Sequence, residues 1–563
     1  MNKTVSCTRK AFYVALFLAG VVLVFYKCRF GYADMDESFY LTIPYRLTMG
    51  DGLFVNEWHL SQMAGFLIYP FMAIYRILFP TGEGIILHFR YLYTALHTIT
   101  ALLIWWRLKK YGGWALSASL LYLLFTPYGI MALSYNSMGV AFVTLSGVFL
   151  ATNFQNRKRI WVVAGMFWAA AVLCCPYLVG GYLIFAVGCL VAWLLAKNRE
   201  NLNALLWVTV GCAALAIVFI AFVFSRASLT ELMAAFPEIL NDPEHPPVSF
   251  ADTSFLYFLY ISRCNKWSPV ILSVSVVLII AILLDRRSSW RQWLYGMAAI
   301  LLSVCLAVPF VIDDPSLNTM MFSMAYLGLF AFLFAPKQNW RPFVFLWVSG
   351  AIYGFCVNWT SNQGFGAISM ASAVSAVGSC IMVGNWVEKW RSEIPNEWMV
   401  KALKFAAIGF VAVFLLLEGK IRYSTLFWEH GGMVDMTRQI QTGPEKGIWV
   451  SEKSESTYLE LLSDITPVVE WEEGPVLYYT VNTIYYLCDQ KDMGTFSAWT
   501  SGTGENSFAK LQTYYQLNPD KFPKVVYCQK TDEFAVEALR GWLEPIGYQC
   551  NETKNGLIFY VSD

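Results

Sequence analysis

Long apolar runs recur along the first three quarters of the chain, with short polar loops between them. A basic N-terminus leads into a run at residues 11–26, and further runs of about 17–22 apolar residues follow, each long enough to cross roughly 30 Å of hydrocarbon as a helix. These further runs begin near Ile85, Trp114, Met138, Trp161, Tyr177, Leu205, Trp267, Gln292, Thr319, Pro342, Phe365 and Ala402. Pro176 divides the longest stretch into two passes because proline breaks the helical hydrogen-bond ladder. The pattern predicts a mostly α, polytopic membrane protein of about thirteen transmembrane helices.

One apolar segment, residues 63–79, fits two arrangements. If it crossed the membrane, the basic loop at residues 107–110 would lie outside and every later loop would be inverted. If it lies along the outer surface, all the basic loops fall inside, and the positive-inside bias favours this arrangement. Those loops are residues 107–110, 157–159, 197–199, 286–287, 337–341 and 389–391. The sequence therefore predicts a surface helix, a cytoplasmic N-terminus and an extracytoplasmic C-terminus.

The overall composition supports this class and excludes others. Hydrophobic residues make up 57% of the chain, charged residues only 14%, and the net charge is +1. A soluble globular protein carries about 25% charged residues, and a nucleic-acid partner would require a concentrated basic face. Most of the 13 Cys lie in apolar runs, and no CxxC pair indicates a zinc site.

The last part of the chain changes character. Turn residues and short alternations replace the apolar runs, and helical patterns lie between the alternations. The alternations are residues 447–451, 476–481, 525–529 and 557–561, and the helical patterns are residues 508–517 and 533–543. The pattern predicts a transmembrane domain over residues 1–418 and a small extracytoplasmic α/β domain over residues 419–563. The latter contains Cys488, Cys528 and Cys550, an odd number that leaves any disulfide pairing open.

Three carboxylates stand together just after the first helix. Asp34, Asp36 and Glu37 open the first external loop, residues 28–84. Like charges this close repel each other, so the cluster implies a cation, a shared proton or a basic partner. It is also a suitable N-terminal cap for a helix over residues 38–49, since acids complement the helix dipole. The two interpretations are compatible.

Four further polar residues lie near the predicted external boundary. His59 is in the same loop as the acids, and Arg90 lies one turn inside the outer end of its helix. Arg263 and Lys266 flank the outer end of a later span, where they could hold a phosphate head group. Each has a plainer interpretation: a polar loop residue for His59, snorkelling for Arg90, and interfacial anchoring for the other two.

The order of features in the first 110 residues resembles the GT-C glycosyltransferases. A basic N-terminus and one helix are followed by an external Asp-Glu, a surface helix that ends in a Gly-Asp turn, a second surface helix, and a helix with an early Arg. The branch most similar to it is glycosyltransferase family 39, which contains protein O-mannosyltransferases and aminoarabinose transferases. The motif-level match covers residues 30–110, while the span count and external C-terminal domain are similar along most of the chain.

The resemblance implies roles for particular residues. Asp36 matches the acid that acts at the acceptor hydroxyl, and Glu37 is its companion. His59 falls near the family's His-Pro-Pro or Glu-Lys-Pro segment, although here the sequence reads His-Leu-Ser-Gln. Several relatives carry an acid in the next short external loop, whereas residues 134–137 read Ser-Tyr-Asn-Ser.

The chemistry that follows is transfer of a sugar on the outer face. Nucleotide sugars are cytoplasmic, so an external acid cluster points to a donor carried on a polyprenyl phosphate. Inverting displacement at the anomeric carbon requires a base, which would be Asp36, and cations for the leaving phosphate, which would be Arg90, Arg263 and Lys266. Asp34 and Asp36 would be the ligands of any divalent metal, and no other cofactor is expected. The acceptor would be a glycan, lipid or protein, and the sugar is not specified.

Two other classes of function remain. A polytopic transporter or flippase of envelope lipids or glycans would place ionisable residues at mid-membrane, where His97 is the main candidate. An envelope scaffold would need only the external domain. The family resemblance favours a bacterial plasma membrane as the location.

Overall fold

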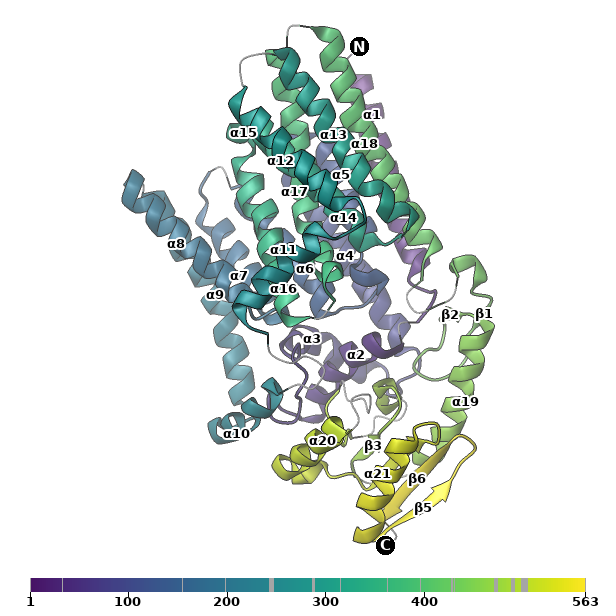
Figure 1. Ribbon diagram of the computed structural model, residues 1–563. Coiled ribbons are helices and arrows are strands. Elements are labelled where there is room, and N and C mark those ends of the chain that lie inside the picture. The colour runs from purple at the N-terminus through teal and green to yellow at the C-terminus, as the bar shows by residue number, and fades with distance from the viewer. Residues whose placement is uncertain are drawn as a thin grey trace.

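The computed structural model describes most of the chain. The residues not described are 1, 33, 154, 198, 242–247, 286–288, 314, 362, 395, 427, 428, 430, 470–473, 488–491, 498–504, 562 and 563, together with the side chains of 2–7, 9, 34, 35, 289, 467, 469, 505 and 506. The described part has two regions: a tall bundle of helices and, below one end of it, a smaller region that contains β-strands (Figure 1).

The helices of the bundle follow the predicted apolar runs. They are α1 (Asn2–Lys27), α4 (Ile85–Leu108), α5 (Gly113–Leu124), α6 (Tyr135–Ala151), α7 (Lys158–Cys174), α8 (Leu178–Ala196), α9 (Arg199–Phe224), α12 (Ser268–Leu284), α13 (Ser289–Ile312), α14 (Leu317–Phe334), α15 (Pro336–Pro342), η3 (Phe343–Val348), α16 (Ser349–Thr360), α17 (Phe365–Glu393) and α18 (Glu397–Ser424). Among the described residues, eight helices are long and apolar enough to cross a membrane, with α15, η3 and α16 counted as one. The break between α7 and α8 falls at Pro176, as predicted. The predicted mostly α, polytopic membrane fold is confirmed.

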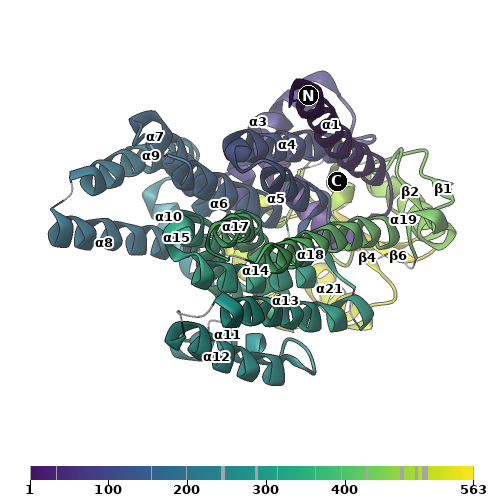
Figure 2. The same cartoon turned by 90° about the horizontal axis from the view of Figure 1, so that it is seen from above.

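Helix α17 is the centre of the bundle. Its most apolar stretch is 94% buried, whereas the corresponding stretches of α8 and α9, which stand at one side in Figure 2, are 11% and 17% buried. Gly328 of α14 lies against Ser379 of α17, and Gly350 of α16 lies against Ser375, with no room for a Cβ at either glycine. Small residues at these contacts let the helix backbones approach closely, which is how membrane helices associate without a hydrophobic driving force.

Two helices of the first external loop lie between the bundle and the region with strands. They are α2 (Asp34–Met49) and α3 (Met63–Leu78), and they pack side by side (Figure 1). Gly65 of α3 fits against Ile43 of α2 with no space for a larger side chain, while Ile77 near the end of α3 is exposed. The segment that fitted two arrangements therefore lies at the end of the bundle, where the surface-helix interpretation predicts it.

The C-terminal region is built on a four-stranded sheet. Its strands are β3 (Val476–Tyr478), β4 (Val525–Gln529), β5 (Tyr548–Glu552) and β6 (Gly556–Val561), in the order β3-β4-β6-β5. β3 is parallel to β4, and the other pairs are antiparallel. A short hairpin, β1 (Arg438–Gln439) and β2 (Trp449–Val450), and three helices, α19 (Glu452–Val469), α20 (Glu505–Leu517) and α21 (Glu533–Leu543), complete the region. The predicted α/β character of this region is confirmed.

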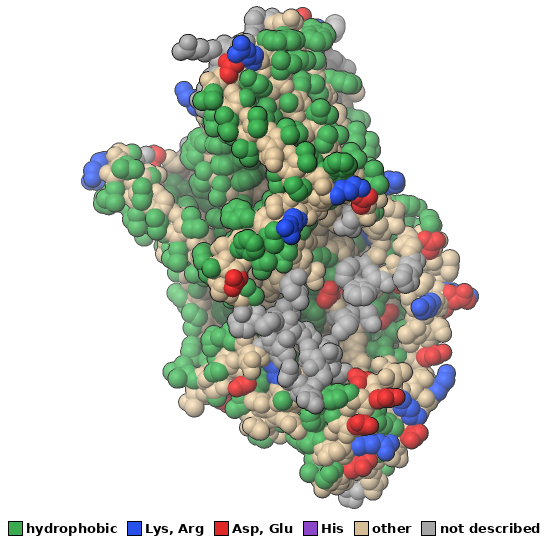
Figure 3. Space-filling view, viewed as in Figure 1, with side chains coloured by type: hydrophobic (Ala, Val, Ile, Leu, Met, Phe, Trp, Pro, Cys, Tyr) green, Lys and Arg blue, Asp and Glu red, His purple; other side chains and the backbone are tan. Residues whose placement is uncertain are grey.

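The apolar core of this region includes residues from the membrane part. Trp58 of the first loop and Ala235 and Ile239 of α10 (Leu229–Leu240) pack with the sheet residues and with α20 and α21. On the surface, charged side chains gather over the C-terminal region, while the flank of the bundle is largely hydrophobic (Figure 3). Cys528 and Cys550 are free thiols, and Cys488 lies outside the described residues.

Candidate active site

The first turn of α2 holds two adjacent carboxylates in different surroundings. Glu37 is 1% exposed and forms a bidentate ion pair with Arg90 of α4, with 2.7 Å from Nε to Oε1 and 2.6 Å between the second pair of atoms. Asp36 is half-buried, and no hydrogen bond or ion pair joins it to a described residue. Consecutive helical residues point about 100° apart, which is why the two side chains separate. The Glu37 carboxylate is thus neutralised by Arg90, whereas the Asp36 carboxylate is available to accept a proton or bind a ligand.

Arg90 also ties the ends of two helices together. Its remaining terminal nitrogen donates to the carbonyl oxygens of Cys28 at 3.1 Å, Phe30 at 3.4 Å and Gly31 at 2.7 Å. These carbonyls belong to the link between α1 and α2, so one guanidinium fixes that link, the start of α2, and α4. A bidentate charge-assisted pair of this kind is strong and directional. Arg90 therefore has a structural role, and its role as a phosphate ligand stays a prediction.

Aromatic side chains surround the free carboxylate. Tyr40 of α2, Tyr128 of the turn η2 (Pro127–Gly129) and Tyr135 of α6 interact electrostatically with Asp36. Burial raises the pKa of the Asp36 carboxyl above its usual value. A carboxylate with a raised pKa accepts a proton more readily, so this environment suits a general base.

His59 belongs to the same aromatic group. Its ring centre lies 4.6 Å from that of Phe39 and 6.4 Å from that of Tyr135, and its Nδ1 is 2.7 Å from the Ser61 hydroxyl. The structure thus brings His59 beside the tyrosine that neighbours Asp36. The tyrosines were missed from the sequence, because aromatic residues are frequent throughout this chain.

The short loop at residues 134–137, which contains no acid, begins helix α6. Ser134 caps α6: its hydroxyl accepts from the Ser137 amide, and the Ser137 hydroxyl accepts from the Ser134 amide. These residues form a capping box, which satisfies the free amides at a helix start.

A small cavity opens beside Arg90. Its lining combines the end of α1, the link to α2, the loop before α6 and the end of α18, and consists of Lys27, Phe30, Gly31, Tyr32, Arg90, Gly129, Ile130, Met131 and Leu426. Lys27 donates to the carbonyls of Arg422 and Thr425, and Arg422 donates to the carbonyl of Leu124. Two of the lining residues are therefore basic, and a third basic residue, Arg422, is in contact with Lys27 through its backbone carbonyl.

Basic residues outnumber acidic ones around this cavity. Lys27, Arg90 and Arg422 are buried; Glu37 of α2 pairs with Arg90, and Glu418 of α18 interacts electrostatically with Arg422. An uncompensated buried cation is costly unless a counter-ion is supplied. The excess of basic residues therefore makes this cavity a candidate site for an anionic group. Lys27 and Arg422 were missed from the sequence, since basic residues at helix ends are ordinary interfacial anchors.

Arg263 and Lys266 lie in a different place. They occupy the turn between α11 (Phe250–Ser262) and α12, both are exposed, and Lys266 pairs with Asp313 at 3.3 Å. No described contact joins them to α2 or to Arg90.

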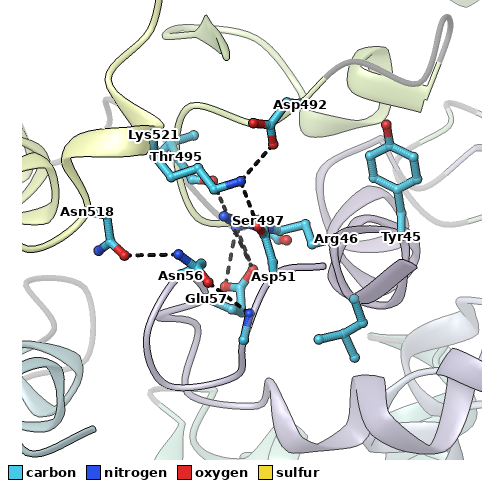
Figure 4. Close-up of polar contacts among 12 residues, drawn as sticks. Tyr45, Arg46, Asp51, Asn56, Glu57, Asp492, Thr495, Ser497, Asn518 and Lys521 are labelled. Atoms are coloured by element: carbon cyan, nitrogen blue, oxygen red, sulfur yellow. Dashed lines mark hydrogen bonds and ion pairs between the residues drawn. The ribbon is translucent and has the colours of Figure 1, made fainter. Parts of the chain in front are cut away.

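A buried charge cluster joins the first loop to the C-terminal region (Figure 4). Arg46, near the end of α2, donates to Asp51 at 2.7 Å, to the Tyr514 hydroxyl at 3.1 Å and to the carbonyl of Thr495, and lies 3.5 Å from Glu57. Thr495 and Tyr514 belong to the C-terminal region, so the helix that begins with Asp36 is held at its other end by residues about 450 positions away in sequence.

Lys521 completes this cluster. Its ammonium lies 2.6 Å from one oxygen of Asp51 and 2.7 Å from Asp492, so Asp51 stands between Arg46 and Lys521 (Figure 4). Burial acts to raise the pKa of Asp51, but the two cations, Arg46 and Lys521, hold it below its usual value. Buried charges are tolerated when they are paired in this way.

The described residues contain no group of three or more His, Cys, Asp or Glu that could hold a metal ion. The side chain of Asp34 lies outside the described residues. The predicted metal pair of Asp34 and Asp36 therefore stays a prediction.

Comparison with known proteins gives a likeness in structure alone. No protein-family model and no curated protein sequence matches the chain. Among solved structures, ArnT from Cupriavidus metallidurans, bound to undecaprenyl phosphate, matches with a TM-score of 0.50 at 9% identity, covering 97% of both chains. The oligosaccharyltransferase of Archaeoglobus fulgidus, tethered to an acceptor peptide, matches with a TM-score of 0.45 at 12% identity, covering 98% of this chain and 74% of that one. The chain thus shares the overall fold of ArnT, a member of the family branch that the sequence resembles.

Proposed function

We propose that this protein is a membrane glycosyltransferase that moves a sugar from a polyprenyl-phosphate-linked donor to an acceptor on the extracytoplasmic face. The observation that carries the proposal is the half-buried carboxylate of Asp36, which has no hydrogen bond or ion pair to a described residue. Its neighbour in sequence, Glu37, pairs with Arg90, and Arg90 lines a cavity together with Lys27. The fold shared with ArnT, whose structure contains undecaprenyl phosphate, supports a lipid-phosphate donor.

The reaction is an inverting displacement. The acceptor hydroxyl or amine attacks the anomeric carbon, the bond from that carbon to the phosphate oxygen breaks, and the electron pair leaves with the lipid phosphate. Asp36 accepts the proton that the acceptor loses, and its raised pKa brings it closer to the strength that this step needs. The acceptor enters on the side of Tyr40 and Tyr135, while the phosphate remains on the cationic side.

The donor phosphate binds at the basic cavity in this proposal. Lys27 and Arg90 both line it, and Lys27 donates to the backbone carbonyl of Arg422. Arg90 is already paired with Glu37, so Lys27 is the lining basic residue that has no carboxylate partner among the described residues. Arg263 and Lys266, exposed on another turn, would contact head groups of the lipid rather than the reacting phosphate. Any divalent metal would bind through Asp34 and Asp36.

The test is transfer of radiolabelled sugar from a polyprenyl phosphate by the purified protein. Asp36→Asn should reduce the rate by roughly 10²–10⁴, which is about 3–5 kcal/mol of barrier. Asp252→Asn is the matched control, because Asp252 is an exposed acid in the first turn of α11, and it should leave the rate unchanged. Near-normal transfer by Asp36→Asn would contradict the proposal. Movement of the lipid-linked sugar across a vesicle without transfer would favour the flippase alternative.

A further inference from the structure

Helix α10 lies across the outer end of a membrane helix. It begins five residues after the end of α9, and Figure 1 shows it turned sharply away from the α9 axis. Its start is well defined, since Ser228 and Glu231 form a capping box. The helix is therefore a regular element whose faces can be assigned from its residues.

One face of α10 is apolar and uncovered. Its large side chains are Leu229, Met233, Phe236 and Leu240, which are 61%, 69%, 51% and 55% exposed. At 100° per residue these four positions fall within about 60° of one another. Four large apolar side chains on one stripe form a continuous patch rather than scattered surface residues, and such a patch marks an interaction site.

The other two faces of α10 differ from this stripe. Ala235 and Ile239 are buried in the apolar core that contains Trp58 and the C-terminal sheet. Glu231 and Glu238 project on the side opposite the exposed stripe, about 180° away by the same helical geometry. A helix with one apolar exposed face and charged residues opposite to it has the pattern of a helix that lies in the plane of a membrane surface. The charges of α10 are acidic, so its apolar stripe supplies the attraction to the membrane.

We infer that this stripe, formed by Leu229, Met233, Phe236 and Leu240, is embedded in the outer boundary of the bilayer that α9 crosses. The exposed apolar surface of α9 runs through Ile217 and Ile220 to Phe224, its last residue, and the stripe resumes at Leu229. The exposed apolar side chains thus continue along the chain from the end of a helix that is long and apolar enough to cross a membrane, and this identifies lipid as the partner.

The buried face of α10 connects the bilayer to the C-terminal domain. This face packs into the core of that domain, and Lys510 of α20 donates to the carbonyl of Asn241 at 3.2 Å, just after the end of α10. Lipid on one face of this helix and the domain core on another would hold the domain at a fixed height above the membrane. This role is independent of the proposed transferase activity.

Photocrosslinking in the full-length protein tests the inference. Benzoylphenylalanine at Met233 should form adducts with the phospholipids of a phosphatidylcholine–phosphatidylglycerol nanodisc. The matched control is the same residue at Ala234, which is also exposed but points away from the stripe. We expect at least a fivefold excess of lipid adduct at position 233. Equal labelling at the two positions, or a crosslink from position 233 to a second copy of the chain, would overturn the inference.

A second measurement tests the connection to the C-terminal domain. Phe236→Asp should increase hydrogen exchange of α10 and α20 amides severalfold in nanodiscs, whereas Ala234→Asp should not. If Phe236→Asp fails to fold, the crosslinking result still decides, because it places an aromatic group on an apolar face. Unchanged exchange in a folded Phe236→Asp protein would show that lipid does not hold this helix.

Discussion

Asp36 and Glu37 are neighbours in one helical turn but have different environments, and a separate prediction follows for each. Because burial raises the pKa of Asp36, its reactive carboxylate form should be lost at a higher pH than for an ordinary aspartate, whose pKa is about 3.9. The acid limb of kcat/KM should therefore lie above pH 4 and should disappear in the residual activity of Asp36→Asn. The measurement is a pH profile of transfer. An acid limb unchanged in Asp36→Asn would assign it to another group.

Asp34→Asn separates a metal role from a base role at the same site. Without a bridging metal, this change should reduce transfer far less than Asp36→Asn. With a metal between the two, both changes should cause large losses, and a chelator should abolish the activity of the unmodified protein. Transfer rates with and without chelator distinguish the two cases.

Glu37 and Arg90 should behave as a buried structural pair. Arg90→Met leaves Glu37 buried without its cation, which typically costs about 3–5 kcal/mol of stability. Glu37→Gln combined with Arg90→Met should recover part of this loss, since no charge then remains unpaired. Thermal unfolding in detergent measures the stability of the single and the double variant. Arg438→Met is the control, because Arg438 belongs to an exposed ion pair. A raised donor KM at unchanged stability would instead mean that Arg90 serves only the phosphate.

At the scale of elements, the link between α2 and the C-terminal domain depends on Lys521. Lys521→Met should loosen this link because it leaves Asp51 and Asp492 with one cation fewer in a buried cluster, whereas Lys521→Arg should preserve it. The measurement is proteolysis of the C-terminal domain in the full-length protein. Lys530→Met is the control, since its pair with Glu552 lies on the surface of the same domain. Equal proteolysis of the two methionine variants would contradict this role.

The pH dependence of this link follows from Asp51. Its pKa is lowered in the folded protein, so the paired carboxylate contributes stability above its unfolded pKa of about 3.9, and that contribution is lost as the pH falls through the lower folded value. The stability difference between the unmodified protein and Asp51→Asn should therefore be largest near neutral pH and should shrink below about pH 4.

Elements with a clear period could be predicted from the sequence, and the others could not. β3, β4 and β6 were predicted from short alternations between turn residues, but β5 was missed because Gln549, Asn551 and Glu552 make it polar at the sheet edge. The acidic helix α19 was also missed. Helix α18 extends to Ser424, past the predicted limit at residue 418. The cluster around Arg46 joins residues hundreds of positions apart, and no local pattern indicates such a pairing.

The candidate site was likewise predicted only where its residues are close together in the sequence. The acid pair, His59 and Arg90 were identified because they stand in one short stretch of sequence. Lys27 and Arg422 were not, because only the packing of α1 against α18 brings the two ends of the membrane part to one cavity. The family resemblance assigned different roles to Asp36 and Glu37, but no local pattern indicated that Arg90 would pair with Glu37 and leave Asp36 without an ion pair.

At the scale of the whole molecule, the arrangement in the membrane remains a prediction from charge. The basic loops all lie at one side if α3 is a surface helix, and the structure places α3 beside α2 at the end of the bundle. Lys109→Cys should therefore react with an impermeant maleimide only from the cytoplasmic side, and Gly541→Cys in α21 only from the outside. Both positions are exposed, and Gly541 has open space around it. The unmodified chain controls for native thiols such as the exposed Cys305. This test reports orientation alone and needs no transfer activity. Reaction at position 109 from the outside would place Asp36 on the cytoplasmic side. Nucleotide sugars are present there, so a lipid-linked donor would no longer be required.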